Sequence, residues 1–394
     1  MTTKLPLKTS LKKGCMNNQI AIYIHWPFCL SLCPYCDFNS HVATEINHAT
    51  WANSYLKELE YFLPQIKGKK ITSVFFGGGT PSLMNASTIS TILNFLTKNC
   101  LLEATTEITL EANPTSVESK KFEDFKSAGI NRLSIGVQSF IEEDLKTLGR
   151  KHSAGDAIKA IELASEKFTN FSFDVIYARP NQTLKSWHQE LELALSFNPK
   201  HISLYQLTIE KGTPFFKLFR DGKLQLPDNE LAADMFELTN EITKYHNFER
   251  YEISNYANLG FECKHNLNYW DYGNYLGIGP GSHSRINGKA IMMLHNPKNW
   301  LSQIEKLSHG IQKETMLAEN ELINEIIMMG LRLSKGISLD NFKSKTDKNF
   351  IELINQDYLN ILLQNNLAEI KDNFFRLLPS GLNLHSYILS RLLA

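Results

Sequence analysis

The sequence predicts an α/β protein built on a parallel sheet. Between residues 20 and 210, apolar, β-branched or aromatic runs alternate with stretches typical of helices. Alternating strands and helices indicate βαβ units, whose strands lie parallel. Six such units fit an incomplete (β/α) barrel, short of the eight units of the complete barrel. A doubly wound open sheet is the alternative that this alternation leaves open.

The individual elements follow from composition and periodicity, since β-branched and aromatic residues favour strands and amphipathic spacing favours helices. The predicted strands are Ile20–Trp26, Ile71–Phe76, Glu107–Glu111, Arg132–Val137, Phe171–Tyr177 and His201–Leu207. The predicted helices between them are Trp51–Leu63, Thr88–Leu96, Val117–Ser127, Ala154–Lys167 and Thr183–Ser196.

The pattern changes after residue 210, where the chain is first mixed and rich in Asn, Gly and Tyr, and then helical. The last part predicts helices and one short strand, in the order Asn320–Ser334, Phe350–Leu363, the strand Asn373–Leu378, and Pro379–Leu393. This order suggests a smaller, winged-helix-like domain. Its scattered charge favours a packing or gating role over DNA binding. The predicted division is an N-terminal extension (1–19), a partial barrel (20–210), a mixed α/β extension (211–310) and a C-terminal domain (311–394).

Composition bounds the class of protein. Of the 394 residues, 43% are hydrophobic, which supports a sizeable core, and 41 basic residues balance 41 acidic ones, so that no field favours nucleic acid. No apolar run approaches the roughly 20 residues of a membrane span, and the first residues lack the apolar core of a signal peptide. We therefore expect a cytoplasmic protein that meets membranes only through a transient, membrane-associated partner.

Three of the six cysteines lie close together, directly after the first predicted strand. Cys29, Cys33 and Cys36 could ligate a four-iron, four-sulfur cluster and leave one iron open to a small molecule. Zinc, with His25 or His41 as fourth ligand, is the alternative, although no second cysteine knuckle is present. A disulfide suits a reducing compartment less well, and unlinked thiols also remain open.

Polar residues follow strand after strand, at the rim where a parallel barrel gathers functional groups. The second strand ends in Gly77-Gly78-Gly79-Thr80, whose backbone amides a ligand could touch directly. The rim also contains Glu111, Gln138, Asp174 and Arg150. Arg150 could offer a planar pair of donors to a carboxylate.

The spacing Cys-x3-Cys-x2-Cys resembles the signature of radical S-adenosylmethionine (SAM) proteins. The flanking run from Tyr23 to Cys29 is similar to the oxygen-independent coproporphyrinogen oxidase family. The resemblance implies a partial barrel, a [4Fe-4S] cluster and SAM, which the open iron chelates through its amino and carboxylate groups. In such proteins an electron from the cluster splits SAM to a 5′-deoxyadenosyl radical.

The resemblance also implies roles for individual residues in binding SAM. Tyr23 and Tyr35 would approach the cofactor, Tyr35 near the adenine. Gly78, Gly79 and Thr80 would lie beside the SAM amino group, with Glu111 as its acceptor. Arg150 would pair with the carboxylate, and Gln138 and Asp174 would bind the ribose hydroxyls.

Two departures from the oxidases define a subgroup. Phe38 stands where the oxidases have a fourth cysteine, and only about 20 residues precede the first strand. The run His265-Asn266-Leu-Asn-Tyr269-Trp270 resembles the motif of the HemW group, which acts in haem handling. A histidine can ligate haem iron, and aromatic rings suit a macrocycle face. The alternative is a hydrogen-bonded loop histidine surrounded by core aromatics.

The resemblance therefore implies a haem chaperone that binds a [4Fe-4S] cluster, SAM and haem. It would pass haem to an acceptor such as a respiratory haem protein, without coproporphyrinogen oxidase activity. A radical SAM decarboxylase or oxidase acting on a porphyrinogen is the competing hypothesis. A radical SAM methyltransferase is the third.

Overall fold

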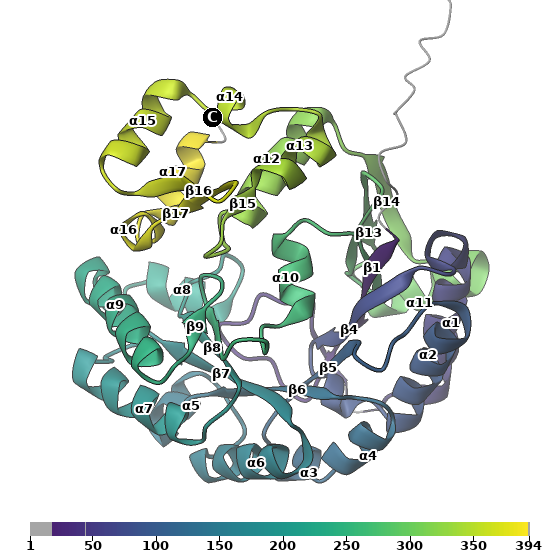
Figure 1. The fold of residues 1–394 in the computed structure, drawn as a ribbon. Helices are drawn as coiled ribbons and strands as arrows, with labels where there is room; N and C mark the ends of the chain where they lie inside the picture. Colours follow the sequence, from purple (N-terminus) through teal and green to yellow (C-terminus); the bar gives the residue numbers. More distant parts are fainter. Residues whose placement is uncertain (1–17, 44, 393–394) are drawn as a thin grey trace, which may run out of the picture.

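The structure, a computed structural model, describes residues 18–43 and 45–392, and its centre is a curved parallel sheet (Figure 1). Six strands pair in chain order: β1 (Gln19–Trp26), β4 (Lys70–Gly78), β5 (Glu107–Ala112), β6 (Arg132–Gln138), β7 (Asn170–Tyr177) and β8 (His201–Gln206). A doubly wound sheet would reverse its order at a switch point, and this order does not reverse. The predicted incomplete barrel is confirmed. Of the predicted extension, residues 1–17 lie outside the described residues, and Gln19 already belongs to β1.

Helices cover the outside of the curved sheet (Figure 1). The longer ones are α1 (His48–Ile66), α2 (Ala86–Asn99), α6 (Ala154–Lys167) and α7 (Leu184–Ser196); shorter ones are η1 (Pro81–Leu83), α3 (Ser116–Ser119), α4 (Phe122–Ser127) and α5 (Glu142–Thr147). Helix α6 begins at a capping box, in which Ser153 and Asp156 satisfy each other's backbone N–H groups. The helix predicted at 117–127 is interrupted, because Lys120 and Lys121 separate α3 from α4.

The chain after residue 210 extends the sheet at both edges. At one edge, β11 (Tyr275–Ile278) pairs with β1 in parallel, and β12 (His283–Ile286), β13 (Lys289–Met293) and β14 (Ile311–Met316) continue antiparallel. At the other edge, β10 (Asn255–Ala257) and β9 (Glu249–Arg250) follow β8. The helices are α8 (Pro214–Arg220), α9 (Asn229–Tyr245), α10 (Lys264–Trp270) and α11 (Pro297–Leu307). Because β14 belongs to this sheet, the unit continues to Met316 rather than ending at 310.

The C-terminal part has a hydrophobic core of its own, which includes Ile326, Leu331, Phe342, Phe350 and Phe375. Its elements are α12 (Glu319–Gly330), β15 (Ile337–Ser338), α13 (Leu339–Thr346), α14 (Phe350–Leu353), α15 (Gln356–Gln364), β16 (Ala368–Lys371), β17 (Phe374–Leu377), α16 (Pro379–Leu382) and α17 (His385–Leu392). The three strands form one small antiparallel sheet, with β17 in the middle. This part is therefore mostly helical with a small sheet, as predicted. No helix among the described residues combines the length and apolarity that crossing a bilayer requires.

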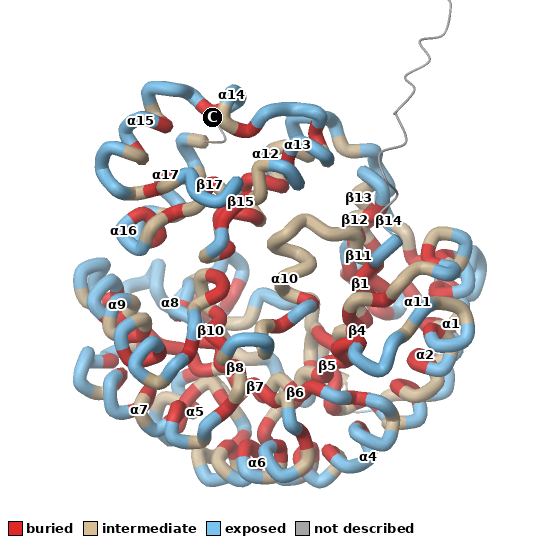
Figure 2. The backbone as a smooth tube through the Cα atoms, in the orientation of Figure 1, coloured by how far each residue is buried: buried red, intermediate tan, exposed pale blue. Residues whose placement is uncertain are grey.

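Buried residues follow the strands of the curved sheet, while the helices expose their outer faces (Figure 2). One of the buried ionisable residues, Glu58, joins three segments that are distant in the sequence. Glu58 of α1 accepts hydrogen bonds from the backbone N–H groups of Gly279 (2.8 Å) and Gly310 (2.7 Å) and from the indole of Trp300 (3.1 Å). Burial raises the pKa of Glu58 to about 7, and the three donors oppose that rise. This carboxyl group therefore attaches the end of β11, helix α11 and the start of β14 to helix α1.

Replacing Glu58 with alanine should leave three buried donors without an acceptor. We expect Glu58→Ala to lower the free energy of unfolding by at least about 2 kcal/mol, measured by denaturant titration. The control is Glu60→Ala, an exposed site on the same helix, where the change should stay within about 0.5 kcal/mol. Equal stabilities of the two variants would contradict the role of Glu58.

Candidate functional site

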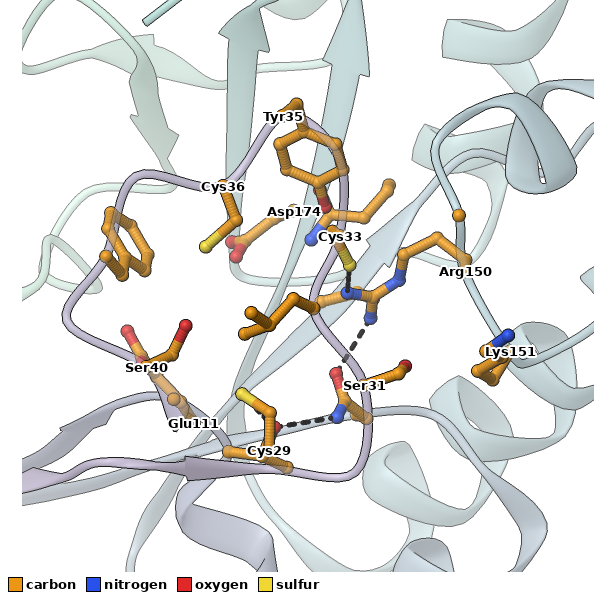
Figure 3. A pocket seen from close by; sticks show the side chains of 18 of the residues that line it. Cys29, Ser31, Cys33, Tyr35, Cys36, Ser40, Glu111, Arg150, Lys151 and Asp174 are labelled. Atoms are coloured by element: carbon orange, nitrogen blue, oxygen red, sulfur yellow. Dashed lines mark hydrogen bonds between the residues drawn. The ribbon is translucent and has the colours of Figure 1, made fainter. Parts of the chain in front are cut away.

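The cysteine loop lies at the carboxyl ends of the parallel strands, where β2 (Phe28–Cys29) pairs with β3 (His41–Val42). Cys29, Cys33 and Cys36 are each partly exposed, and they face the same space as Glu111 and Asp174 (Figure 3). This space is a cavity of about 360 Å³, called here the first cavity.

The arrangement of the thiols bears on which metal they could hold. Within residues 18–43 and 45–392, no three His, Cys, Asp or Glu side chains are grouped to hold a single metal ion. A four-iron cluster binds each thiolate on a different iron, and so it does not require three sulfurs around one point. The loop at the cavity wall therefore fits a cluster.

The glycine run at the end of β4 lies directly against the start of this loop. The N–H of Gly79 donates to the carbonyl of Trp26 (2.7 Å), and the N–H of Thr80 donates to the carbonyl of Phe28 (2.8 Å). A Cβ atom on Gly79 would lie 2.8 Å from the Phe28 carbonyl oxygen and 3.0 Å from the Cys29 sulfur. Side chains essentially never approach so closely, so this position requires glycine for a close backbone approach. The glycine run therefore allows the strand end to pack directly against the cysteine loop, and it is not merely a flexible turn.

A hydrogen-bonded chain of side chains connects two of the three cysteines. The hydroxyl of Thr80 donates to the Cys29 sulfur (3.3 Å), and the amide of Asn113 donates to Thr80 (3.2 Å). Arg150 donates to the Asn113 carbonyl oxygen (2.8 Å) and to the Cys33 sulfur (3.6 Å), as Figure 3 shows for Cys33. Donors to thiolate sulfur stabilise its charge and tune a bound metal centre.

Two partly buried carboxyl groups line the first cavity. Burial and the nearby charge of Asp174 raise the pKa of Glu111 to about 8, although the N–H of Gly78 donates to it at 3.0 Å. Burial raises the pKa of Asp174 to about 6. The Oδ1 atom of Asp174 is buried and has no hydrogen-bond partner among the residues that the structure describes. An unsatisfied buried acceptor indicates a site that a donor group of a ligand would complete.

Gln138 has a strained backbone beside this cavity. Its φ angle is 68°, in the left-handed region, and the pairing of β6 with β7 shifts register between Ile135 and Gln138. Such strain concentrates at functional sites. Tyr35 also lines the cavity and packs on Phe215, with ring centroids 6.3 Å apart. Burial raises the pKa of the Tyr35 phenol, which stays neutral.

Eight of the nine residues that the sequence assigns to SAM therefore line the first cavity. The ninth, Tyr23, faces an adjoining cavity of about 430 Å³, called here the second cavity. Its hydroxyl is 3.1 Å from Nδ1 of His25. The two cavities share Phe38, Gly78 and Glu111 in their walls.

The residues of the predicted haem motif divide between the wall of the second cavity and the interior. Tyr269 and Trp270 line the second cavity, whereas His265 and Asn266 do not. His265 is 1% exposed, with Nδ1 2.8 Å from the Ser73 hydroxyl and Nε2 2.9 Å from the Tyr269 hydroxyl. Burial lowers its pKa to about 3. In this arrangement neither ring nitrogen is free for iron, and the alternative of a hydrogen-bonded histidine among core aromatics agrees with the geometry.

Some residues of the site carried no role in the sequence interpretation. Asn113 lies two residues after Glu111, so its position at a strand end was a signal that could have found it. The ion pair of Arg285 with Glu325 (2.7 Å) gave no local signal, because it joins β12 to α12 across the second cavity.

A partial barrel with a three-cysteine loop at its strand ends defines a class of cluster-bearing protein, and comparison identifies the class. The family model described as radical SAM superfamily matches residues 23–194, and the HemN C-terminal domain matches residues 317–384. The solved coproporphyrinogen III oxidase (HemN) of Escherichia coli shares the fold, with a TM-score of 0.80 at 20% identity. The match covers 96% of this chain and 91% of that chain.

Relatives in sequence define the family more closely. A protein named Heme chaperone HemW from Buchnera aphidicola (subsp. Schizaphis graminum) is 39% identical over 346 residues, 86% of this chain and 88% of the relative. Its namesake from Escherichia coli is 42% identical over 269 residues, 68% and 70% of the two chains. A protein from Danio rerio is 38% identical over 329 residues, which are 81% of this chain and 74% of the relative; it is named Radical S-adenosyl methionine domain-containing protein 1, mitochondrial. The chain belongs to the HemW family of the radical SAM superfamily.

The three-cysteine loop predicts the metal content. Anaerobic reconstitution with iron and sulfide should give about four irons per chain. Cys29→Ala, Cys33→Ala and Cys36→Ala should each abolish this uptake, because each removes one thiolate ligand. Cys100→Ala and Cys263→Ala are the controls and should leave it intact; Cys15 lies outside the described residues. One tightly bound zinc and no uptake of iron would contradict the cluster.

The polar chain across the first cavity predicts the effect of removing its cation. Arg150→Ala should weaken SAM binding by about 30- to 150-fold, through the loss of a charge-assisted pair worth about 2–3 kcal/mol. Asp174→Ala should weaken it less, because it removes hydrogen bonds to hydroxyl groups. Isothermal titration of the reconstituted variants measures both. Unchanged affinity in Arg150→Ala would remove this residue from the SAM site.

Proposed function

We propose that this chain is a haem chaperone, which holds a [4Fe-4S] cluster and SAM in the first cavity, binds haem, and passes it to an acceptor protein. Cys29, Cys33 and Cys36 hold the cluster. The acceptor is a haem protein such as a respiratory one, and the transfer takes place in the cytoplasm. Similarity to relatives from Buchnera aphidicola and Escherichia coli that are named Heme chaperone HemW supports this proposal.

The residues of the first cavity have distinct tasks in this proposal. A bound cluster supplies an electron and an iron that is open to SAM. Arg150 orients the carboxylate of SAM, and Glu111 accepts a hydrogen bond from its amino group beside the Gly78–Thr80 run. Asp174 and Gln138 accept hydrogen bonds from the ribose hydroxyls. The half-buried loop excludes part of the solvent from the sulfurs.

The observation that carries the proposal over its alternative is Phe38. Its ring is 63% exposed and lies in the walls of both cavities, where the oxidases place a fourth cysteine. An apolar ring there provides contact area for a macrocycle, and it supplies no thiol. The alternative is an oxygen-independent coproporphyrinogen III oxidase, a radical SAM enzyme that decarboxylates a porphyrinogen.

Haem binding and the absence of decarboxylation test this proposal together. Titration with haem should produce a Soret band that saturates with protein. Under reducing conditions with SAM present, coproporphyrinogen should release no carbon dioxide, while the coproporphyrinogen III oxidase of Escherichia coli serves as the positive control. Robust release of carbon dioxide by this chain would restore the oxidase alternative.

A further inference from the structure

The second cavity contains a histidine whose ring nitrogens have no hydrogen-bond partner in the described parts of the chain. His283 begins β12 on the cavity wall and is exposed, next to the Gly279–Gly281 turn. We propose that the second cavity is the haem site and that His283 is the ligand to the haem iron. This inference rests on the proposed function, since it assumes that haem is the cargo.

The other candidate ligands at this cavity are hydrogen-bonded, disfavoured by their protonation or weaker donors. His25 has Nδ1 at 3.1 Å from the Tyr23 hydroxyl and Nε2 at 2.9 Å from the carbonyl of Asn39. Burial raises the pKa of Tyr275, so its phenolate is disfavoured as a ligand. The thioether of Met329 lies on the wall and could supply a second, weaker ligand. His283 is therefore the neutral nitrogen donor that iron would meet first.

The protonation of His283 suits this role. Partial burial and the charges of Arg285 and His295 lower the pKa of the His283 imidazole. A lowered pKa keeps the ring neutral near pH 7, and only the neutral imidazole can donate a lone pair to iron.

The walls of the second cavity fit a flat aromatic ligand. Tyr269 and Tyr275 meet edge to face with ring centroids 4.5 Å apart, and Trp270 lies beside them with the Arg332 guanidinium 4.4 Å from its ring centroid. Rigid aromatic side chains offer large contact areas to a macrocycle at low entropic cost. His265 supports this wall from within, because its Nε2 is bonded to the Tyr269 hydroxyl.

The charges around the second cavity predict which part of the haem molecule it binds. Arg285 is the one Arg or Lys among the described lining residues, and Glu325 of α12 already neutralises it at 2.7 and 2.8 Å. Among the described residues of this wall, no cation is left free to pair with a propionate. The cavity therefore holds the ring face and the iron, and it leaves the propionates at the open mouth. Binding without ion pairs to the propionates suits a protein that must release haem to an acceptor.

The first test compares histidines by the spectrum of bound haem. His283→Ala should shift or abolish the Soret band of the haem-loaded protein while cluster iron and sulfide stay unchanged. His295→Ala, an exposed histidine nearby that does not line the cavity, is the matched control and should keep the wild-type spectrum. His265→Gln should keep the band position, because both nitrogens of His265 are used inside the barrel.

The second test distinguishes binding of the porphyrin ring by the second cavity from ligation of the iron by His283. Iron-free protoporphyrin IX needs no ligand, so its fluorescence change on binding should persist in His283→Ala. Met329→Trp should block both haem and protoporphyrin by filling the cavity. Met328→Trp places the same ring at the neighbouring position of α12, outside the lining, and should block neither.

The outcomes distinguish this inference from the proposed function. A wild-type spectrum in His283→Ala together with a shifted one in His265→Gln would overturn the assignment of His283, although haem binding would stand. Normal binding of both porphyrins by Met329→Trp would overturn the assignment of the cavity. If the wild-type protein binds no haem, the proposed function itself fails.

Discussion

The close approach of the β4 glycine run to the cysteine loop is the constraint on which the site depends. The N–H groups of Gly79 and Thr80 bond the carbonyls of Trp26 and Phe28, and a Cβ atom at position 79 would collide with the Phe28 carbonyl, so the loop is fixed against the ends of β1 and β4. Thr80 then reaches Cys29, and through Asn113 the same bonds reach Arg150 and Cys33. A side chain at position 79 would separate the loop from the sheet and interrupt this chain of contacts.

The parallel pairing of β11 with β1 brings the second cavity to the same place. Residues more than two hundred positions apart in the chain become neighbours, with Tyr23 opposite Gly277. This pairing puts β12 and the end of α10 beside the glycine run, while α12 closes the opposite side through Glu325. The two cavities consequently meet at Phe38, Gly78 and Glu111. Haem bound in the second cavity would therefore lie directly beside the SAM and cluster site.

Much of this arrangement could be predicted from the sequence, because the relevant signals are local. A strand of alternating or continuous apolar residues with a polar residue at its end identifies both the strand and the rim position, and Glu111 and Gln138 were found in that way. Asp174 was found as the one carboxylate within the apolar run of β7. The placement of Tyr23 and His265 could not be predicted. Which cavity Tyr23 faces depends on the strands on either side of β1, and the burial of His265 depends on α10 packing against β4. The short elements β15 and α13 were also missed, since they gain their stability from the C-terminal core.

Adjoining cavities are proposed to hold the cluster and the haem. A crystal structure of the anaerobically reconstituted, haem-loaded protein, with anomalous scattering recorded at the iron edge, tests this arrangement most directly. We expect one iron peak at Cys29, Cys33 and Cys36 and a second, separate peak at His283, in the cavity bounded by Tyr275 and Met329. Iron density from haem beside His265, or on a surface away from the second cavity, would contradict it.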